Sequence, residues 1–184
     1  MRRFTTAQTA VAAFLLSEAV FFGFLIAAYV YFYPQAARGA GRDLDPPRTL
    51  IFTLCLLASS ATLWLAERRM TAGGRNGFRL WLGVTIALGA VFLAGQGLEY
   101  AGLFAKSVTP ERDLFGATFF TLTGFHGFHV LCGLVSLLAL LALTFRADFG
   151  EAARRGVGAV ALYWHFVDAV WIVIFSLVYL TVWI

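Results

Sequence analysis

The chain has 184 residues, of which 60% are hydrophobic and only 13% are charged. An ordinary soluble domain carries about a quarter charged residues, so the composition excludes a soluble globular protein. The formal charge of +4 comes from arginines at the edges of apolar segments, not from a long basic cluster, which argues against a nucleic-acid partner.

Long apolar segments separated by short charged gaps predict an all-α, polytopic membrane protein with a single membrane domain, residues 1–184. A helix needs about 20 apolar residues to cross the hydrocarbon core of a bilayer. Five transmembrane helices are expected, at about residues 7–33, 49–66, 80–105, 114–145 and 157–183. All four prolines fall in the gaps, where a missing N–H group breaks no helix: Pro34, Pro46, Pro47 and Pro110.

The first apolar segment starts like a signal peptide, because Arg2 and Arg3 precede an apolar run. The run, however, continues to Tyr33, well beyond the roughly 7–15 apolar residues of a signal peptide. We therefore expect a retained first helix, with Glu18 near its middle.

The two cysteines, Cys55 and Cys132, fall inside the second and fourth apolar segments. A thiol in such a position ordinarily packs as a small apolar side chain. We therefore expect neither a disulfide nor a zinc site from them.

Lysine and arginine are unevenly shared between the two sides of the membrane, which predicts the orientation. One side, with the N-terminus, holds nine of them: Arg2, Arg3, Arg68, Arg69, Arg75, Arg79, Arg146, Arg154 and Arg155. The other side holds five: Arg38, Arg42, Arg48, Lys106 and Arg112. We expect a cytoplasmic N-terminus and an outside C-terminus. The pairs Arg68–Arg69 and Arg154–Arg155 are expected to attract anionic lipid headgroups at the cytoplasmic edge.

Six ionisable side chains lie within the expected helices and are the functional candidates: Glu18, Glu99, His126, His129, His165 and Asp168. A charged form of each costs about 2.5–3.5 kcal/mol or more at the bilayer centre, so such groups normally face the bundle interior and find partners. Two pairs of these residues, His126 with His129 and His165 with Asp168, have the i, i+3 spacing of one helix face. We expect Glu18 to meet His165 across the bundle and share a proton with it.

Three interpretations of these residues remain open from the residues alone. A metal or haem site is one, because histidine pairs and carboxylates converge in di-metal bundles, although the chain has no Glu-x-x-His motif. Proton transport through Glu18, Glu99 and Asp168 is another. The third is structural: buried polar pairs fix the register of helices in the bundle or against a partner.

Five stretches resemble, in order and spacing, subunit III of the haem–copper respiratory oxidases. They are SEAVFFGFLIAAY (17–29), TLIFTLCLLASSATLWLA (49–66), QGLEY (96–100), FGATFFTLTGFHGFHVLCG (115–133) and YWHFVDAVWIVIFSLVY (163–179). They extend from the first expected helix to the last. The longest members of that family have seven helices, and the resemblance begins at their third.

The resemblance implies a non-catalytic chain in the inner membrane of a bacterium, packed against a large catalytic subunit and other oxidase subunits. It implies no haem, copper or other metal in this chain, haem and copper in the partner subunits, and phospholipid as a ligand. The complex would reduce oxygen with electrons from cytochrome c or quinol, coupled to proton translocation. This subunit would stabilise the catalytic subunit and sustain its proton uptake.

The resemblance also maps the family's membrane-buried glutamate onto Glu18 and that residue's histidine partner onto His165. It leaves Asp168, His126, His129 and Glu99 as supporting intramembrane residues. Two alternatives to the oxidase role are an accessory subunit of a nitric oxide reductase and a free-standing haem- or metal-binding membrane protein.

Overall fold

The computed structural model describes residues 6–36, 43–145 and 151–180, without the side chains of 6–8, 34–36 and 151–155. This part of the chain forms five helices: α1 (Thr6–Ala36), α2 (Pro46–Thr71), α3 (Arg75–Ala105), α4 (Leu114–Leu143) and α5 (Glu151–Val178). All five are long and apolar enough to cross a bilayer. The all-α class and the five expected membrane helices are thereby confirmed. Residues 181–183, the end of the fifth expected helix, lie outside the described part.

Two helices begin at an aspartate that caps them. Asp45 accepts a hydrogen bond from the Arg48 backbone N–H at 3.2 Å, and Pro46 occupies the first helical position of α2. Asp113 accepts from the Gly116 backbone N–H at 2.7 Å at the start of α4. Each carboxylate satisfies an N–H group that has no partner inside its helix. Because of this cap, α2 begins a few residues earlier than the apolar pattern predicted.

A tight turn joins α2 to α3 and makes them antiparallel neighbours with the most extensive helix contact of the fold. Gly73 has a φ of 79°, a left-handed conformation that glycine adopts without steric cost. Its N–H donates to the Met70 carbonyl at 3.1 Å, and the Gly74 N–H donates to the Arg69 carbonyl at 2.9 Å. These bonds end α2 at Thr71, well beyond the expected end at residue 66.

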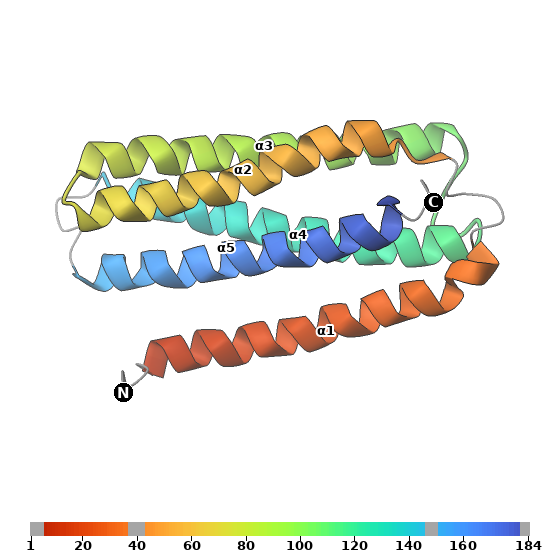
Figure 1. The fold of residues 1–184 in the computed structure, drawn as a ribbon, viewed down its shortest axis with the longest axis horizontal. Coiled ribbons are helices and arrows are strands. Elements are labelled where there is room, and N and C mark those ends of the chain that lie inside the picture. Colours follow the sequence, from red (N-terminus) through yellow and green to blue (C-terminus); the bar gives the residue numbers. More distant parts are fainter. Residues whose placement is uncertain (1–5, 37–42, 146–150, 181–184) are drawn as a thin grey trace.

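Helix α1 lies along one edge of the bundle formed by the other four (Figure 1). It packs against α4 and, less extensively, α5. Most of its side chains point away from the bundle, including Phe24 and Tyr31, which are each 73% exposed. Phe22 and Tyr29 are buried. Helix α1 is therefore held by a narrow face.

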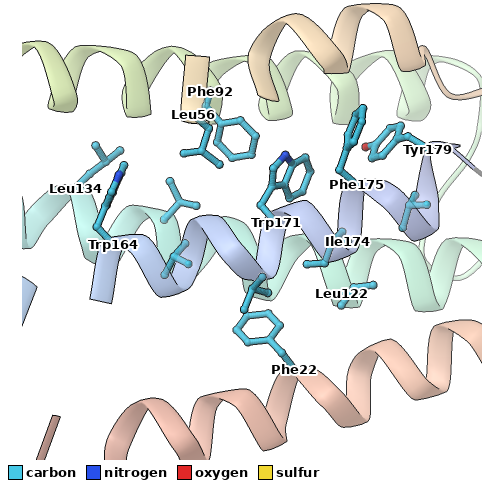
Figure 2. Packing of buried hydrophobic residues seen from close by; sticks show 14 of the residues in the cluster. Phe22, Leu56, Phe92, Leu122, Leu134, Trp164, Trp171, Ile174, Phe175 and Tyr179 are labelled. Carbon is cyan, nitrogen blue, oxygen red and sulfur yellow. The ribbon is translucent and has the colours of Figure 1, made fainter. Parts of the chain in front are cut away.

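Helix α5 supplies the largest buried side chains of the core, among them Trp164 and Trp171 (Figure 2). The Trp164 indole N–H donates to Ser59 Oγ at 2.9 Å. The Trp171 indole N–H donates to Thr53 Oγ1 at 3.0 Å. A buried tryptophan needs such a partner for its one polar atom. These two bonds connect α5 to α2.

Two glycines leave the space that Trp164 fills. A Cβ atom at Gly89 of α3 or at Gly133 of α4 would lie 2.7 Å from the nearest carbon of the Trp164 ring. Small residues let helix backbones approach closely in a membrane, where the hydrophobic effect does not drive helices together. Trp164 therefore contacts α2, α3 and α4 at once.

We predict that Gly133→Ala destabilises the bundle, because the buried Trp164 ring cannot move away from the added methyl group without meeting Gly89. Overpacking of this kind costs roughly 1–3 kcal/mol. Gly97→Ala is the control, since a Cβ there meets nothing within 4 Å and alanine is the better helix former. Thermal unfolding in detergent, followed by circular dichroism, should show a lower midpoint for Gly133→Ala alone. Equal midpoints for the two variants would contradict this packing.

Candidate functional site

A carboxyl–imidazole pair joins α1 to α4. Glu18 Oε2 lies 2.9 Å from His129 Nε2. The other ring nitrogen, His129 Nδ1, lies 2.7 Å from the Phe125 carbonyl oxygen of the preceding turn. The edge of the Phe22 ring packs against the imidazole, with ring centroids 4.9 Å apart. The side chains of Glu18 and His129 are only 19% and 11% exposed.

The hydrogen-bond geometry fixes how many hydrogens this pair holds. A carbonyl oxygen can only accept, so His129 Nδ1 must carry a hydrogen and donate it to Phe125. Nε2 and the Glu18 oxygen then need one further hydrogen between them, whichever of the two atoms holds it. The pair is electrically neutral in both cases. Neutrality is what a low-dielectric membrane environment favours.

The histidine that meets Glu18 is therefore His129 and not His165, the partner expected from the sequence. Helix α1 packs mainly on α4, and the α5 residue beside this pair is Tyr163, whose OH donates to the His129 carbonyl at 3.0 Å. His165 follows Tyr163 by two positions, which corresponds to a rotation of about 200° around the axis of α5. His165 therefore points away from α1 and cannot reach Glu18.

His165 and Asp168 instead meet α2 through one serine. Ser60 Oγ lies 2.8 Å from His165 Nδ1 and also hydrogen-bonds to Asp168 Oδ2. Asp168 is 3% exposed, and its second oxygen, Oδ1, has no partner among the described residues. His165 and Asp168 thus lie on the same face of α5, and Ser60 of α2 lies between their side chains.

The other histidine of the GFHGFH stretch, His126, lies in the aromatic core. It is fully buried and stacks on the Trp171 ring, with centroids 4.8 Å apart and planes 26° apart. The rings of Phe22 and Phe92 approach it edge-on. Neither of its ring nitrogens has a hydrogen-bond partner in the described part of the chain. His126 and His129 therefore differ in environment although they are one helical turn apart.

Glu99 forms a third polar group, near one end of the bundle. Its Oε2 accepts from the Tyr179 OH at 2.7 Å, and its Oε1 lies 3.1 Å from Thr49 Oγ1. Gln96 Nε2 donates to Oε2 at the long distance of 3.5 Å. Glu99 thus connects α3 to α2 and to the residue that follows α5. It borders a cavity of about 140 Å³ that Asp45 and Arg48 also line.

Comparison with known proteins decides the family. The sequence model described as "Cytochrome c oxidase subunit III" matches residues 5–183. The chain belongs to the cytochrome c oxidase subunit III family.

Individual members of the subunit III family are similar to this chain over most of their length. Cytochrome c oxidase subunit 3 of Corynebacterium diphtheriae is 35% identical over 174 residues, which cover 90% of this chain and 83% of that protein. Cytochrome bo(3) ubiquinol oxidase subunit 3 of Pseudomonas aeruginosa is 36% identical, covering 91% and 81%. The probable cytochrome c oxidase subunit 3 of Mycobacterium leprae is 35% identical, covering 90% and 83%. This chain is a multi-pass membrane subunit III of a bacterial respiratory oxidase.

In this subunit III the six ionisable candidates lie in three separate clusters, apart from one isolated histidine. The first is Glu18–His129, the second Ser60–His165–Asp168 and the third is centred on Glu99, while His126 stands apart. Ser60, Thr49 and Tyr179 were missed by the sequence analysis, since a serine, threonine or tyrosine within an apolar segment carries no signal of its own. The described residues contain no group of three or more His, Cys, Asp or Glu side chains placed to hold a metal ion.

The arginines expected at lipid headgroups are only partly described. The Arg68 guanidinium lies 3.5 Å from the centroid of the Trp64 ring, a cation–π contact at the end of α2. The Arg69 stem lies against Gly77, at the start of α3. The side chains of Arg154 and Arg155 lie outside the described residues. A headgroup role for these four arginines stays a prediction.

We predict that Glu18 and His129 are energetically coupled. Glu18→Ala leaves His129 Nε2 without a partner, and His129→Ala does the same to the carboxyl group, so the double variant should lose less stability than the sum of the single losses. Hydrogen bonds between membrane helices couple by about 0.6 kcal/mol on average and at most about 1.7 kcal/mol. A double-mutant cycle, based on the free energy of unfolding of each variant in detergent, measures this coupling energy. Strict additivity would show that the two side chains do not interact.

Proposed function

We propose that this subunit III is a non-catalytic accessory subunit of a haem–copper terminal oxidase, which holds the catalytic subunit in its working form and supports its proton uptake. In this proposal haem and copper belong to partner subunits and none to this chain. The complex reduces oxygen with electrons from cytochrome c or quinol and translocates protons.

The observation that carries the proposal is that the intramembrane carboxyl groups bond to residues of this same chain. Glu18 is bonded to His129, Asp168 to Ser60 and Glu99 to Tyr179. Metal ligation or proton conduction would need these groups to be open to an ion or to water. Hydrogen bonds between side chains of different helices are instead what helix register requires. The pairs therefore support an architectural role.

The Glu18–His129 pair acts, in this proposal, by setting the position of α1. Helix α1 has a narrow contact face, so a single polar bond fixes a large part of its register against α4. Losing that bond would let α1 shift against α4 and loosen the subunit. The expected consequence is loss of the subunit during turnover, and with it a faster decline of activity.

The proposed orientation, with the N-terminus in the cytoplasm, is supported by the distribution of arginines at the two ends of the bundle. The start of α1 and the α2–α3 turn lie at the same end (Figure 1). That turn is flanked by Arg68, Arg69, Arg75 and Arg79. Arginine is enriched on the cytoplasmic side of membrane proteins. Anionic phospholipid headgroups are the proposed partners of Arg68 and Arg69.

The experiment that tests the accessory role purifies a tagged copy of the chain from its own membranes in mild detergent. The co-purifying proteins are identified from their peptides, and absorption spectra are recorded for the complex and for the chain alone. We expect a large haem-bearing oxidase subunit in the complex and no Soret band from the isolated chain. A haem band from the isolated chain that His165→Ala abolishes, or recovery of a nitric oxide-reducing subunit, would contradict the proposal.

We predict that Glu18→Ala shortens the active life of the oxidase, because His129 is left unpaired and α1 loosens. Glu18→Gln should stay close to the wild type, since its amide N–H can donate to His129 Nε2. The measurement is oxygen consumption by the purified complex, followed until activity declines, together with the amount of subunit III retained afterwards. Equal retention and equal decline for Glu18→Ala and the wild type would rule out this role of the pair.

A further inference from the structure

The Ser60–His165–Asp168 cluster plays no part in the contact between α1 and α4. It lies near the middle of the span Pro46–Thr71 and of the span Gly156–Val178, so it is at mid-membrane depth. Asp168 is buried, whereas Ser60 and His165 are partly exposed on the outside of the bundle. An ionisable histidine at the bundle surface and at this depth needs an explanation, since such residues normally face the interior.

Two arrangements of the protons leave the cluster without net charge and without a buried O–H group that lacks an acceptor. In one neutral arrangement, protonated Asp168 donates to Ser60 Oγ, Ser60 donates to His165 Nδ1, and the neutral imidazole carries its hydrogen on Nε2. In the other, Ser60 donates to ionised Asp168, and a doubly protonated His165 donates to Ser60 from Nδ1. The two arrangements differ by moving one proton along each hydrogen bond. Both leave a hydrogen on His165 Nε2.

His165 Nε2 therefore presents an N–H donor, and no described residue of this chain accepts from it. Hydrocarbon tails offer no acceptor at this depth. A donor left without a partner forfeits its hydrogen bond, and the loss is larger in an apolar medium than in water. An acceptor from outside the chain would remove this cost.

The surface around this donor is shaped for close approach of another helix. We call it the α2/α5 face and define it by Ser60, Leu162, His165, Ala169 and Ile172. Apart from Ser60 and His165, which are partly exposed, these residues are exposed. Ala169 lies one helical turn beyond His165. Small residues beside a polar group are what a tightly packed helix contact in a membrane uses.

We propose that the α2/α5 face binds a transmembrane helix of the catalytic subunit, which supplies an oxygen acceptor to His165 Nε2. The acceptor is a hydroxyl, amide or carboxyl oxygen, or a backbone carbonyl freed at a helix break. The inference rests on the proposed accessory function, because it takes the partner to be the catalytic subunit. It adds the face and the chemical group through which the two are joined.

The first test separates the two nitrogens of His165. His165→Gln keeps an N–H donor where Nε2 lies but loses the bond to Ser60. His165→Asn keeps an amide near Nδ1, beside Ser60, but loses the outward donor. We expect His165→Asn to lower the ratio of catalytic subunit to tagged subunit III in mild detergent by about tenfold, the effect of one lost hydrogen bond of about 1.4 kcal/mol. His165→Gln should stay close to the wild type. The opposite order would show that His165 serves only the Ser60 bond.

The second test uses the exposed alanine, whose substitution leaves the cluster untouched. Ala169→Leu adds bulk to the α2/α5 face, and Ala90→Leu adds the same bulk to an exposed position at similar depth on α3. We expect Ala169→Leu alone to lower retention of the catalytic subunit, with unchanged thermal unfolding of the isolated chain. Equal retention in the two variants would overturn the proposed face.

A photo-crosslinking residue at position 169 of the assembled complex identifies the occupant directly. Attachment to a transmembrane peptide of the catalytic subunit supports the proposal, whereas attachment to lipid alone, or to a second copy of this chain, overturns it. Failure of the wild-type chain to co-purify with any haem-bearing subunit would instead contradict the accessory function itself. The two failures are therefore distinguishable.

Discussion

The fold depends on one constraint: a polar hydrogen inside the hydrocarbon core is costly unless it finds an acceptor within the protein. Apolar packing alone does not select one helix arrangement, because lipid tails are as apolar as the side chains. The hydrogen bonds between helices therefore decide which helices are neighbours. Trp164 and Trp171 connect α5 to α2, and Glu18 connects α1 to α4.

The same constraint explains how an ionisable side chain is tolerated at this depth. Glu18 and His129 share one proton and carry no net charge, and Ser60 allows Asp168 and His165 to do the same. Each arrangement uses a third group that accepts or relays a hydrogen, the Phe125 carbonyl in the first case and the serine in the second. The clusters differ because the second has an N–H donor, His165 Nε2, that no described residue of this chain accepts from. That donor is why we assign partner binding to the α2/α5 face and register to the α1–α4 contact.

The sequence was sufficient for the class of fold and for the set of polar candidates, but not for their pairing. Apolar segments of membrane length predicted the five helices, and all six ionisable candidates lie within them. The partner of Glu18 was predicted wrongly as His165, because apolar periodicity does not say which helix α1 lies against. Ser60 was missed for a related reason: its neighbour Ser59 looks the same in the sequence, yet Ser59 bonds to Trp164 and Ser60 to the histidine. Helix ends were extended by Asp45 and Gly73, whose effect is local and lies outside the apolar pattern.

The measurement that tests this account most directly is the nitrogen spectrum of the three imidazoles, recorded by solid-state NMR on protein with ¹⁵N-labelled histidine in lipid bilayers. Single substitutions at His126 and His165 assign the signals. The account predicts a hydrogen on Nδ1 of His129 that donates to a carbonyl, and an Nε2 that shares one hydrogen with a carboxyl group. A bare Nδ1 on His129, or an Nε2 that shares no hydrogen with a carboxyl group, would contradict the central claim that a neutral, one-proton pair holds α1 to α4.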